Sequence, residues 1–142
     1  MSELLLIDNS AFARLWDKRL ERSVVEATAA EIDGGRIASC LPFVLEAGYS
    51  ARGADEHSEL TRRLLKLPFF SIDGSIERLA LRAQEQLVRS GHHRLPPVDL
   101  LIAALAHAHG LGVLHYDADY DLIGELTDLR FESRWIVSRG SL

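Results

Sequence analysis

The sequence predicts a single α/β domain whose central sheet is mostly parallel, with about five strands flanked by helices. Short apolar runs with strand character alternate along the chain with longer segments of helical period, and this alternation is typical of βαβ units. The chain has 142 residues, 47% of them hydrophobic, which suits one compact domain better than two. Because no repeat or low-complexity tract divides it, residues 1–142 are expected to form one domain.

Five short apolar runs are the expected strands. They are LLLID at 4–8, RIASCL at 36–41, PFFSID at 68–73, GVLHYD at 112–117 and FESRWIV at 131–137. A parallel sheet is covered by helices on both faces, so its strands are apolar without strict alternation. These runs therefore favour one buried sheet.

Helical segments are expected between these strands, at 9–17, 23–33, 42–51, 57–67, 75–88 and 98–110. Capping residues begin the segment 9–17, two glycines follow the end of the segment 23–33, and a proline begins the segment 42–51. The fourth and fifth space their apolar residues at helical intervals, which predicts amphipathic helices. The sixth is nearly all apolar and is therefore expected to be buried, after a loop at 89–97.

Composition limits the classes of function. A net charge of −5 argues against a surface that coats nucleic acid, although it does not exclude a nuclease. The single Cys40 cannot form an intramolecular disulfide and is expected to be a small core residue in a reducing cytoplasm. The start MSELLLID lacks the features of a secretion signal, and polar residues interrupt the apolar run 98–114. A cytoplasmic protein without a membrane span is expected.

Several acidic residues stand beside apolar sequence, and two of them end expected strands. Asp8 and Asp117 are both in this position, and ligands of parallel sheets gather outside the carboxyl ends of the strands. Asp119 follows two residues later and can turn to the same ligand. Asp99 heads the buried helix, and Glu46 lies in apolar surroundings, where an unpaired carboxylate costs several kcal/mol. These acids are expected to converge.

Each of these acids also has a structural interpretation. Asp8 is explained equally well as a helix N-cap, and Asp99 taken alone is better explained as a first-turn carboxylate that the helix dipole favours. Asp121, at the start of the following helix, is interpreted as a cap. Glu46 is harder to explain without a cation.

Four or five carboxylates at one edge repel one another unless a cation neutralises them, and oxygen ligands favour Mg²⁺ or Mn²⁺. A calcium-binding EF-hand loop is excluded, because DADYDLIGELTD has Leu122 and Asp128 where glycine and glutamate are required. A phospho-acceptor receiver domain needs a lysine late in the chain, and the last lysine is Lys66. The nucleotide-binding motifs GxGxxG and GxxxxGK[ST] are absent.

Three stretches, LLLIDNSAF, LEAGYSAR and LPPVDLLIAALAHAHGLGVLHYDADYDLI, together resemble the PIN-domain ribonucleases, and specifically the VapC toxins of bacterial toxin–antitoxin pairs. The resemblance covers essentially the whole chain in order, spacing and length. Matched motif by motif, the family's acids correspond to Asp8, Glu46, Asp99, Asp117 and, less uniformly, Asp119. Ser10 matches a small hydroxyl residue that supports the site, whereas His115 stands where the family commonly has Thr or Ser.

The resemblance implies a PIN-like fold and metal-dependent endonucleolytic cleavage of RNA. Mg²⁺ or Mn²⁺ held by Asp8, Asp99 and Asp117 would polarise the scissile phosphate and activate a water, which Glu46 or Asp119 would orient or deprotonate. No protein nucleophile is needed. Basic residues near the pocket, above all His93 and Arg94, are the candidates for binding flanking phosphates.

The resemblance also implies a homodimer and a cognate VapB-type antitoxin that lies in a hydrophobic groove and sends a basic side chain into the acidic pocket. Plausible groove residues, for which core packing is an equal alternative, are Phe12, Leu15, Trp16, Phe43 and Tyr49. Two other functions remain open: a PIN nuclease that processes RNA or cuts DNA without an antitoxin, and a non-enzymatic acidic binding domain. A surface or supporting role is favoured over zinc binding for His92, His93, His107, His109 and His115.

Overall fold

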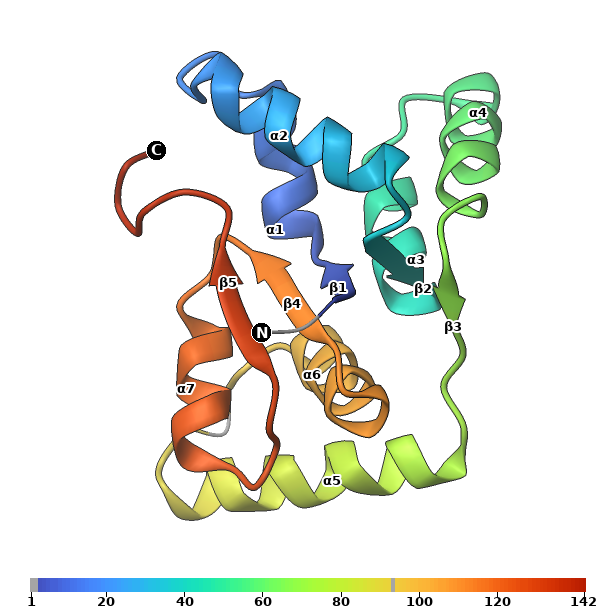
Figure 1. Cartoon of the computed structure of the whole chain (residues 1–142). Coiled ribbons are helices and arrows are strands. Elements are labelled where there is room, and N and C mark those ends of the chain that lie inside the picture. Colours follow the sequence, from blue (N-terminus) through green and yellow to red (C-terminus); the bar gives the residue numbers. More distant parts are fainter. Residues whose placement is uncertain (1–2, 93) are drawn as a thin grey trace.

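The computed structural model describes residues 3–92 and 94–142 (Figure 1). In this part of the chain five strands form one sheet, in the order β3-β2-β1-β4-β5, and every neighbouring pair is parallel. The strands are β1 (Leu5–Ile7), β2 (Ile37–Cys40), β3 (Phe69–Phe70), β4 (Gly112–His115) and β5 (Glu132–Trp135). The predicted α/β class is confirmed, and the sheet is wholly parallel.

The order of the strands places a switch point in the middle of the sheet. From β1 the chain builds outward through β2 to β3, and it then returns to the other side of β1 to form β4 and β5. The connection that follows β1 therefore runs toward one edge of the sheet, and the connection that follows β4 runs toward the other edge. Where two neighbouring strands diverge in this way, a crevice opens at their carboxyl ends. Leu5 pairs with Gly112 and Ile7 with Leu114, so β1 and β4 end side by side.

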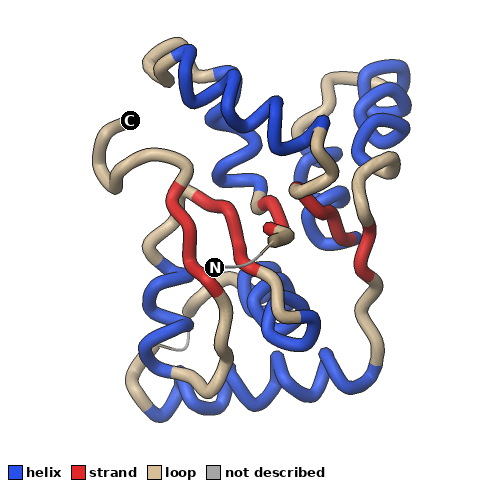
Figure 2. The backbone as a smooth tube through the Cα atoms, viewed as in Figure 1, coloured by secondary structure: helices blue, strands red, loops and turns tan. Residues whose placement is uncertain are grey.

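Helices surround the strands (Figure 2). They are α1 (Asn9–Phe12), the 3₁₀-helix η1 (Ala13–Trp16), α2 (Arg22–Asp33), α3 (Leu41–Tyr49), α4 (Ala54–Leu64), α5 (Gly74–Arg89), α6 (Pro97–His109) and α7 (Asp119–Leu126). Helix α6 packs on β1 and β4, and α5 packs along α6 on the side away from the sheet.

The core lies between the sheet and α6. Strands β1, β2 and β4 are buried along their whole length, and α6 buries an unbroken run from Ile102 to Ala106, which confirms the expected buried helix. Cys40 is a free, fully buried thiol, as predicted, and burial raises its pKa to about 11. Among the described residues, no helix combines the length and apolar character that crossing a bilayer requires.

Apart from shifts of one or two residues at the ends of most elements, three elements differ from the prediction. Helix α4 begins at Ala54 rather than at residue 57. The acidic residues of its first turn interact favourably with the positive end of the helix dipole and so stabilise the earlier start. The expected strand 68–73 is reduced to Phe69–Phe70, since Asp73 accepts a hydrogen bond from the Ile76 amide and so caps α5. The expected helix 9–17 divides into α1 and η1.

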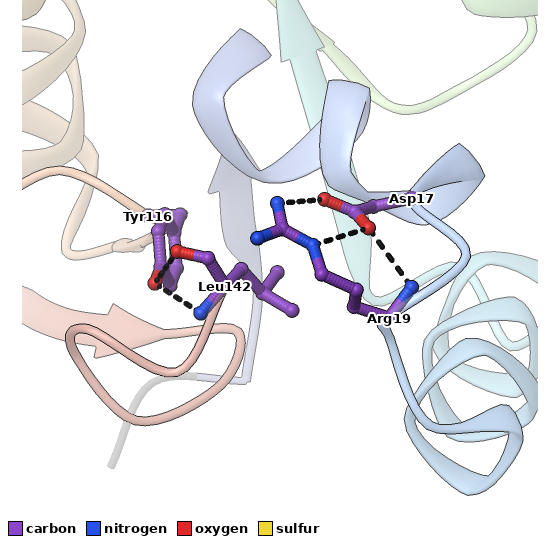
Figure 3. A network of polar contacts seen from close by, with 4 residues as sticks. All are labelled: Asp17, Arg19, Tyr116 and Leu142. Atoms are coloured by element: carbon purple, nitrogen blue, oxygen red, sulfur yellow. Dashed lines mark hydrogen bonds and ion pairs between the residues drawn. The ribbon is translucent and has the colours of Figure 1, made fainter.

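The end of η1 has a visible local cause (Figure 3). Asp17 has an extended backbone, and its Oδ1 accepts hydrogen bonds from the Arg19 amide at 2.9 Å and from Nε at 3.1 Å. These contacts lower the pKa of the Asp17 carboxyl to about 2.

In the same region the Leu142 amide donates to the Tyr116 hydroxyl at 2.9 Å, so the C-terminal segment folds back toward the end of β4.

Candidate metal-binding active site

The acids singled out in the sequence lie around the switch point. Asp8 directly follows β1, and its amide donates to the Leu114 carbonyl of β4 at 2.9 Å. Asp117 lies two residues after β4, Asp119 begins α7, and Asp99 is in the first turn of α6. Glu46 comes from α3. Four separate parts of the chain thus contribute carboxylates to one region.

Three of these carboxylates could hold a metal ion together. Asp99, Asp117 and Asp119 each offer an oxygen, and the three oxygens lie within 4.8 Å of one another. Asp99 is only 4% exposed, and its Oδ2 is buried without a hydrogen-bond partner among the described residues. A buried, unsatisfied carboxylate oxygen is costly, and oxygen donors of this kind suit Mg²⁺ or Mn²⁺. The residues present therefore fit a divalent ion.

Asp8 is beside this group but is held by the protein. Its Oδ2 accepts from the Ser10 amide at 3.0 Å, so the N-cap interpretation is correct for α1. Its Oδ1 accepts from the Tyr120 hydroxyl at 2.9 Å. The same hydroxyl lies 3.4 Å from Oδ1 of Asp99. Tyr120 thus bridges the two most buried acids of the site.

Sequence reasoning missed Tyr120. The available signal was its position three residues before Ile123, on the apolar face of a helix whose first turn is acidic, because a buried tyrosine usually needs a partner for its hydroxyl. The side chain is fully buried. Burial and the nearby acids raise the pKa of Tyr120 well above its ordinary value, so the phenol stays a donor.

The acids influence one another electrostatically. Burial, followed by the charges of Asp8, Asp117, Asp119 and Glu46, raises the pKa of Asp99 to about 8. Burial and Asp117 raise the pKa of Asp119. Burial, with Asp8 and Asp117, raises the pKa of Glu46. Without a cation, therefore, the cluster retains a proton on Asp99 near neutral pH.

A second polar network lies behind the acids. The Asp117 amide donates to Nδ1 of His115 at 3.1 Å, and Nε2 of His115 lies 2.7 Å from the Ser133 hydroxyl. That hydroxyl lies 2.6 Å from Oδ1 of Asp121, whose Oδ2 accepts from Trp135 Nε1 at 2.9 Å. The interpretation of Asp121 as a cap is wrong, because its carboxylate faces β5 instead of the free amides of α7.

The other predicted site residues are placed as follows. The Ser10 hydroxyl accepts from the Tyr116 amide at 2.9 Å, which ties α1 to the end of β4. Arg94 is exposed in the loop before α6, and His93 lies outside the described residues. His107 accepts from the Arg130 amide at 2.8 Å. In the described part of the chain, histidine takes no place in the group of possible metal ligands.

The candidate groove residues divide between core and surface. Phe43 is fully buried and packs edge-on to Phe12, with ring centroids 5.3 Å apart, so for Phe43 the core alternative is correct. Trp16 is 68% exposed and Tyr49 is 91% exposed. Tyr49 borders a mainly apolar groove of about 480 Å³, lined by Leu41, Pro42, Leu45, Glu46, Tyr49, Ile72, Val98 and Leu101. Glu46 joins this groove to the acidic cluster.

Replacing Tyr120 by Phe is expected to lower the free energy of unfolding by about 1–2 kcal/mol, because Oδ1 of Asp8 loses its buried donor while the ring remains. Urea unfolding of the metal-free protein at pH 7 measures this. Tyr49→Phe, on the surface, is the matched control and is expected to change stability by less than about 0.5 kcal/mol. Equal stability of the Tyr120 variant and the parent would contradict the bridging role.

The fold and the site define an α/β domain with an acidic cluster at the switch point of a parallel sheet. Residues 5–126 match the PIN domain family, so the chain belongs to this family, and its similarity to two ribonucleases over most of its length places it in the VapC group. It is 39% identical over 138 residues to Ribonuclease VapC51 of Mycobacterium tuberculosis, with 96% of each chain covered. It is 38% identical over 142 residues to Ribonuclease VapC2 of the same species, with 89% of each covered.

Solved structures agree on the fold. The DNA-bound VapBC structure from Salmonella typhimurium matches with a TM-score of 0.70 at 15% identity, covering 94% of this chain and 99% of that one. VapBC2 from Rickettsia felis, bound to a promoter DNA fragment, matches with a TM-score of 0.71 at 13% identity, covering 93% and 98%.

Proposed function

We propose that this chain is the toxin of a VapBC-type toxin–antitoxin pair, and that it is an endoribonuclease dependent on Mg²⁺ or Mn²⁺. The observation that carries the proposal is the group formed by Asp99, Asp117 and Asp119, with its unsatisfied buried oxygen. Relatives that match over nearly the whole chain are named ribonucleases. The proposal places the protein in the cytoplasm, which suits the free thiol of Cys40.

We assign the ion to Asp99, Asp117 and Asp119, with Asp8 as a further ligand. Each Asp8 oxygen accepts one hydrogen bond and retains lone-pair capacity. A divalent ion bound there supplies positive charge to the scissile phosphate and activates water for attack. Tyr120 holds Asp8 and Asp99 in fixed positions, so little reorganisation is needed when charge develops.

Glu46 is the proposed proton acceptor. It is partly exposed and lies at the border between the groove and the acidic cluster. Burial and the charges of Asp8 and Asp117 raise its pKa, which brings a carboxylate closer to the range in which it accepts a proton from water effectively. The role of Arg94, an exposed cation before α6, is to bind a phosphate that flanks the cleaved bond.

The proposed partners are RNA, a VapB-type antitoxin and a second copy of the chain. The apolar groove bordered by Leu45 and Tyr49 suits an apolar segment of the antitoxin, and Glu46 at its edge suits a basic side chain of that segment. A basic group that enters the acidic cluster would compete with the metal ion, and this provides a means of inhibition.

The test is cleavage of a single-stranded RNA and of a DNA of the same sequence. We expect the purified protein to cut the RNA with Mn²⁺ or Mg²⁺ and to lose this activity in EDTA, because the carboxylates of Asp99, Asp117 and Asp119 are grouped so that they can hold the ion together. Addition of a cognate VapB-type antitoxin is expected to stop cleavage. Cleavage of DNA alone would favour the alternative nuclease, and undiminished cleavage in EDTA would refute the metal-dependent mechanism.

A further inference from the structure

His115 occupies an unusual place for a histidine. It is the last residue of β4, it is fully buried, and it lies two residues before Asp117. Its two ring nitrogens face in different directions, toward the Asp117 amide on one side and toward the Ser133 hydroxyl of β5 on the other. The ring therefore fills the space between the acidic turn and the neighbouring strand.

The hydrogen bonds define one form of the ring. The Asp117 amide is a donor, so Nδ1 of His115 must be the unprotonated acceptor. Nε2 then carries the proton and donates to the Ser133 hydroxyl, which in turn donates to Asp121. Because Trp135 donates to the second oxygen of Asp121, this carboxylate is held as an acceptor. Three residues of α7 and β5, namely Asp121, Ser133 and Trp135, thus favour the tautomer of His115 that can accept a hydrogen bond from the Asp117 amide.

The same ring also touches the other half of the acidic cluster. His115 stacks on Tyr120 with centroids 4.8 Å apart and an interplanar angle of 28°. Tyr120 donates to Asp8 and approaches Asp99. Oδ1 of Asp117 in turn accepts a hydrogen bond from the Asp119 amide at 2.9 Å. The imidazole of His115 therefore contacts both the backbone at Asp117 and the ring of Tyr120, whose hydroxyl lies beside Asp8 and Asp99.

We propose that His115 is a positioning residue: its Nδ1 fixes the backbone at Asp117, so that the carboxylates of Asp117 and Asp119 face Asp99 and can bind a divalent ion together. The inference rests on the proposed metal-dependent function and adds a residue to it. Groups behind the ligands of a metal site commonly change metal affinity or activity by about 10–100-fold when they are altered. His115, Ser133 and Asp121 form such a group here.

Two substitutions separate the two ring nitrogens. Asn places its Oδ1 near the position of Nδ1, so His115→Asn keeps an acceptor for the Asp117 amide and loses the contact with Ser133. Gln places its amide near the position of Nε2, so His115→Gln keeps a donor for Ser133 and loses the acceptor for Asp117. Both variants lose the stacking on Tyr120. A difference between them therefore reports the hydrogen bonds of the two ring nitrogens and not the loss of stacking.

Isothermal titration with Mn²⁺ provides the main measurement. We expect the dissociation constant of His115→Gln to rise by about tenfold or more relative to the parent, and that of His115→Asn to stay within about threefold. Amide hydrogen exchange at Asp117 is expected to be faster in the Gln variant than in the Asn variant. Equal Mn²⁺ affinities in the two variants, or a parent that does not bind Mn²⁺, would overturn the proposal.

Ser133→Ala is a milder second variant and keeps the imidazole. The ¹⁵N chemical shifts of His115 are expected to show the Nε2–H tautomer in the parent and a mixture in Ser133→Ala; an Nδ1–H tautomer in the parent would overturn the proposal. These readouts need no RNA. A parent that binds Mn²⁺ with the predicted Gln and Asn difference but cuts no RNA would refute the proposed function and leave the role of His115 standing.

Discussion

Replacing Asp99 by Asn is expected to abolish RNA cleavage while making the metal-free protein more stable. The loss of activity should be at least about a thousandfold, equivalent to about 4 kcal/mol of transition-state stabilisation, because the proposed metal ion loses the ligand whose buried oxygen has no other partner among the described residues. The reason for the gain in stability is separate. Asp99 is buried beside four other acids that raise its pKa, so removing its charge relieves repulsion.

The size of this gain in stability depends on pH. The pKa of Asp99 in the folded protein is about 8, against an ordinary value of 3.8. Between these values the folded state binds more protons than the unfolded state, so the stability of the metal-free parent falls as pH rises from about 4 to about 8. Asn does not titrate, and the variant is expected to exceed the parent by about 1–3 kcal/mol at pH 8 and by less at pH 5.

Thermal melts in EDTA at pH 5 and pH 8, beside cleavage assays with Mn²⁺, measure both effects. Asp33→Asn, at the exposed end of α2, is the matched control and is expected to retain full activity and the pH profile of the parent. If the loss of cleavage in Asp99→Asn were accompanied by an equal loss of folded protein, Asp99 would be a structural residue and the assignment of the metal site would fail.

Metal binding itself is expected to depend steeply on pH. Below pH 8 the ion must displace a proton from Asp99, so Mn²⁺ affinity should rise about tenfold per pH unit between pH 6 and pH 7.5 and level off above about pH 8. Titration calorimetry in buffers of different ionisation enthalpy should detect about one proton released per ion. At a free Mn²⁺ concentration of 100 times the dissociation constant, the folded state should gain about 2.7 kcal/mol.

The Asp99→Asn variant serves as the control for this pH dependence. It lacks the titrating carboxyl, so any residual Mn²⁺ binding should vary much less with pH and release a smaller fraction of a proton. A parent whose Mn²⁺ affinity is constant from pH 6 to pH 8 would show that Asp99 is not a ligand, even if cleavage requires the metal.

The sheet and the position of the acids could be predicted from the sequence because both depend on local signals. The apolar runs that become β1, β2 and β4 are short and bounded by helix-forming sequence, and a residue that follows a parallel strand must lie at its carboxyl edge. For this reason the sequence predicts that Asp8 and Asp117 lie at one edge of the sheet. Asp99 and Glu46 depended more on the resemblance to PIN domains, since a first-turn aspartate alone indicates little beyond the helix dipole.

The supporting contacts could not be predicted in this way. Tyr120 reaches Asp8 across 112 residues of chain, and Asp121 meets Ser133 only because α7 packs on β5. Such contacts depend on the angle and register of packed elements, which periodicity does not encode. The wrong interpretation of Asp121 as a cap has the same origin, because a first-turn aspartate can face either its own helix or a neighbouring strand.

The pairing of β1 with β4 also affects the order of events during synthesis. Leu5 pairs with Gly112, so the two strands that carry the acidic edge are more than a hundred residues apart in the chain. A growing polypeptide on the ribosome that has emerged only as far as α6 contains Asp8, Glu46 and Asp99 but lacks Asp117 and Asp119. Because pairings between distant strands form late, a nascent chain would stay harmless to the cell's RNA until β4 has emerged and joined the sheet. That interval is time in which an inhibitor can bind before the enzyme becomes active.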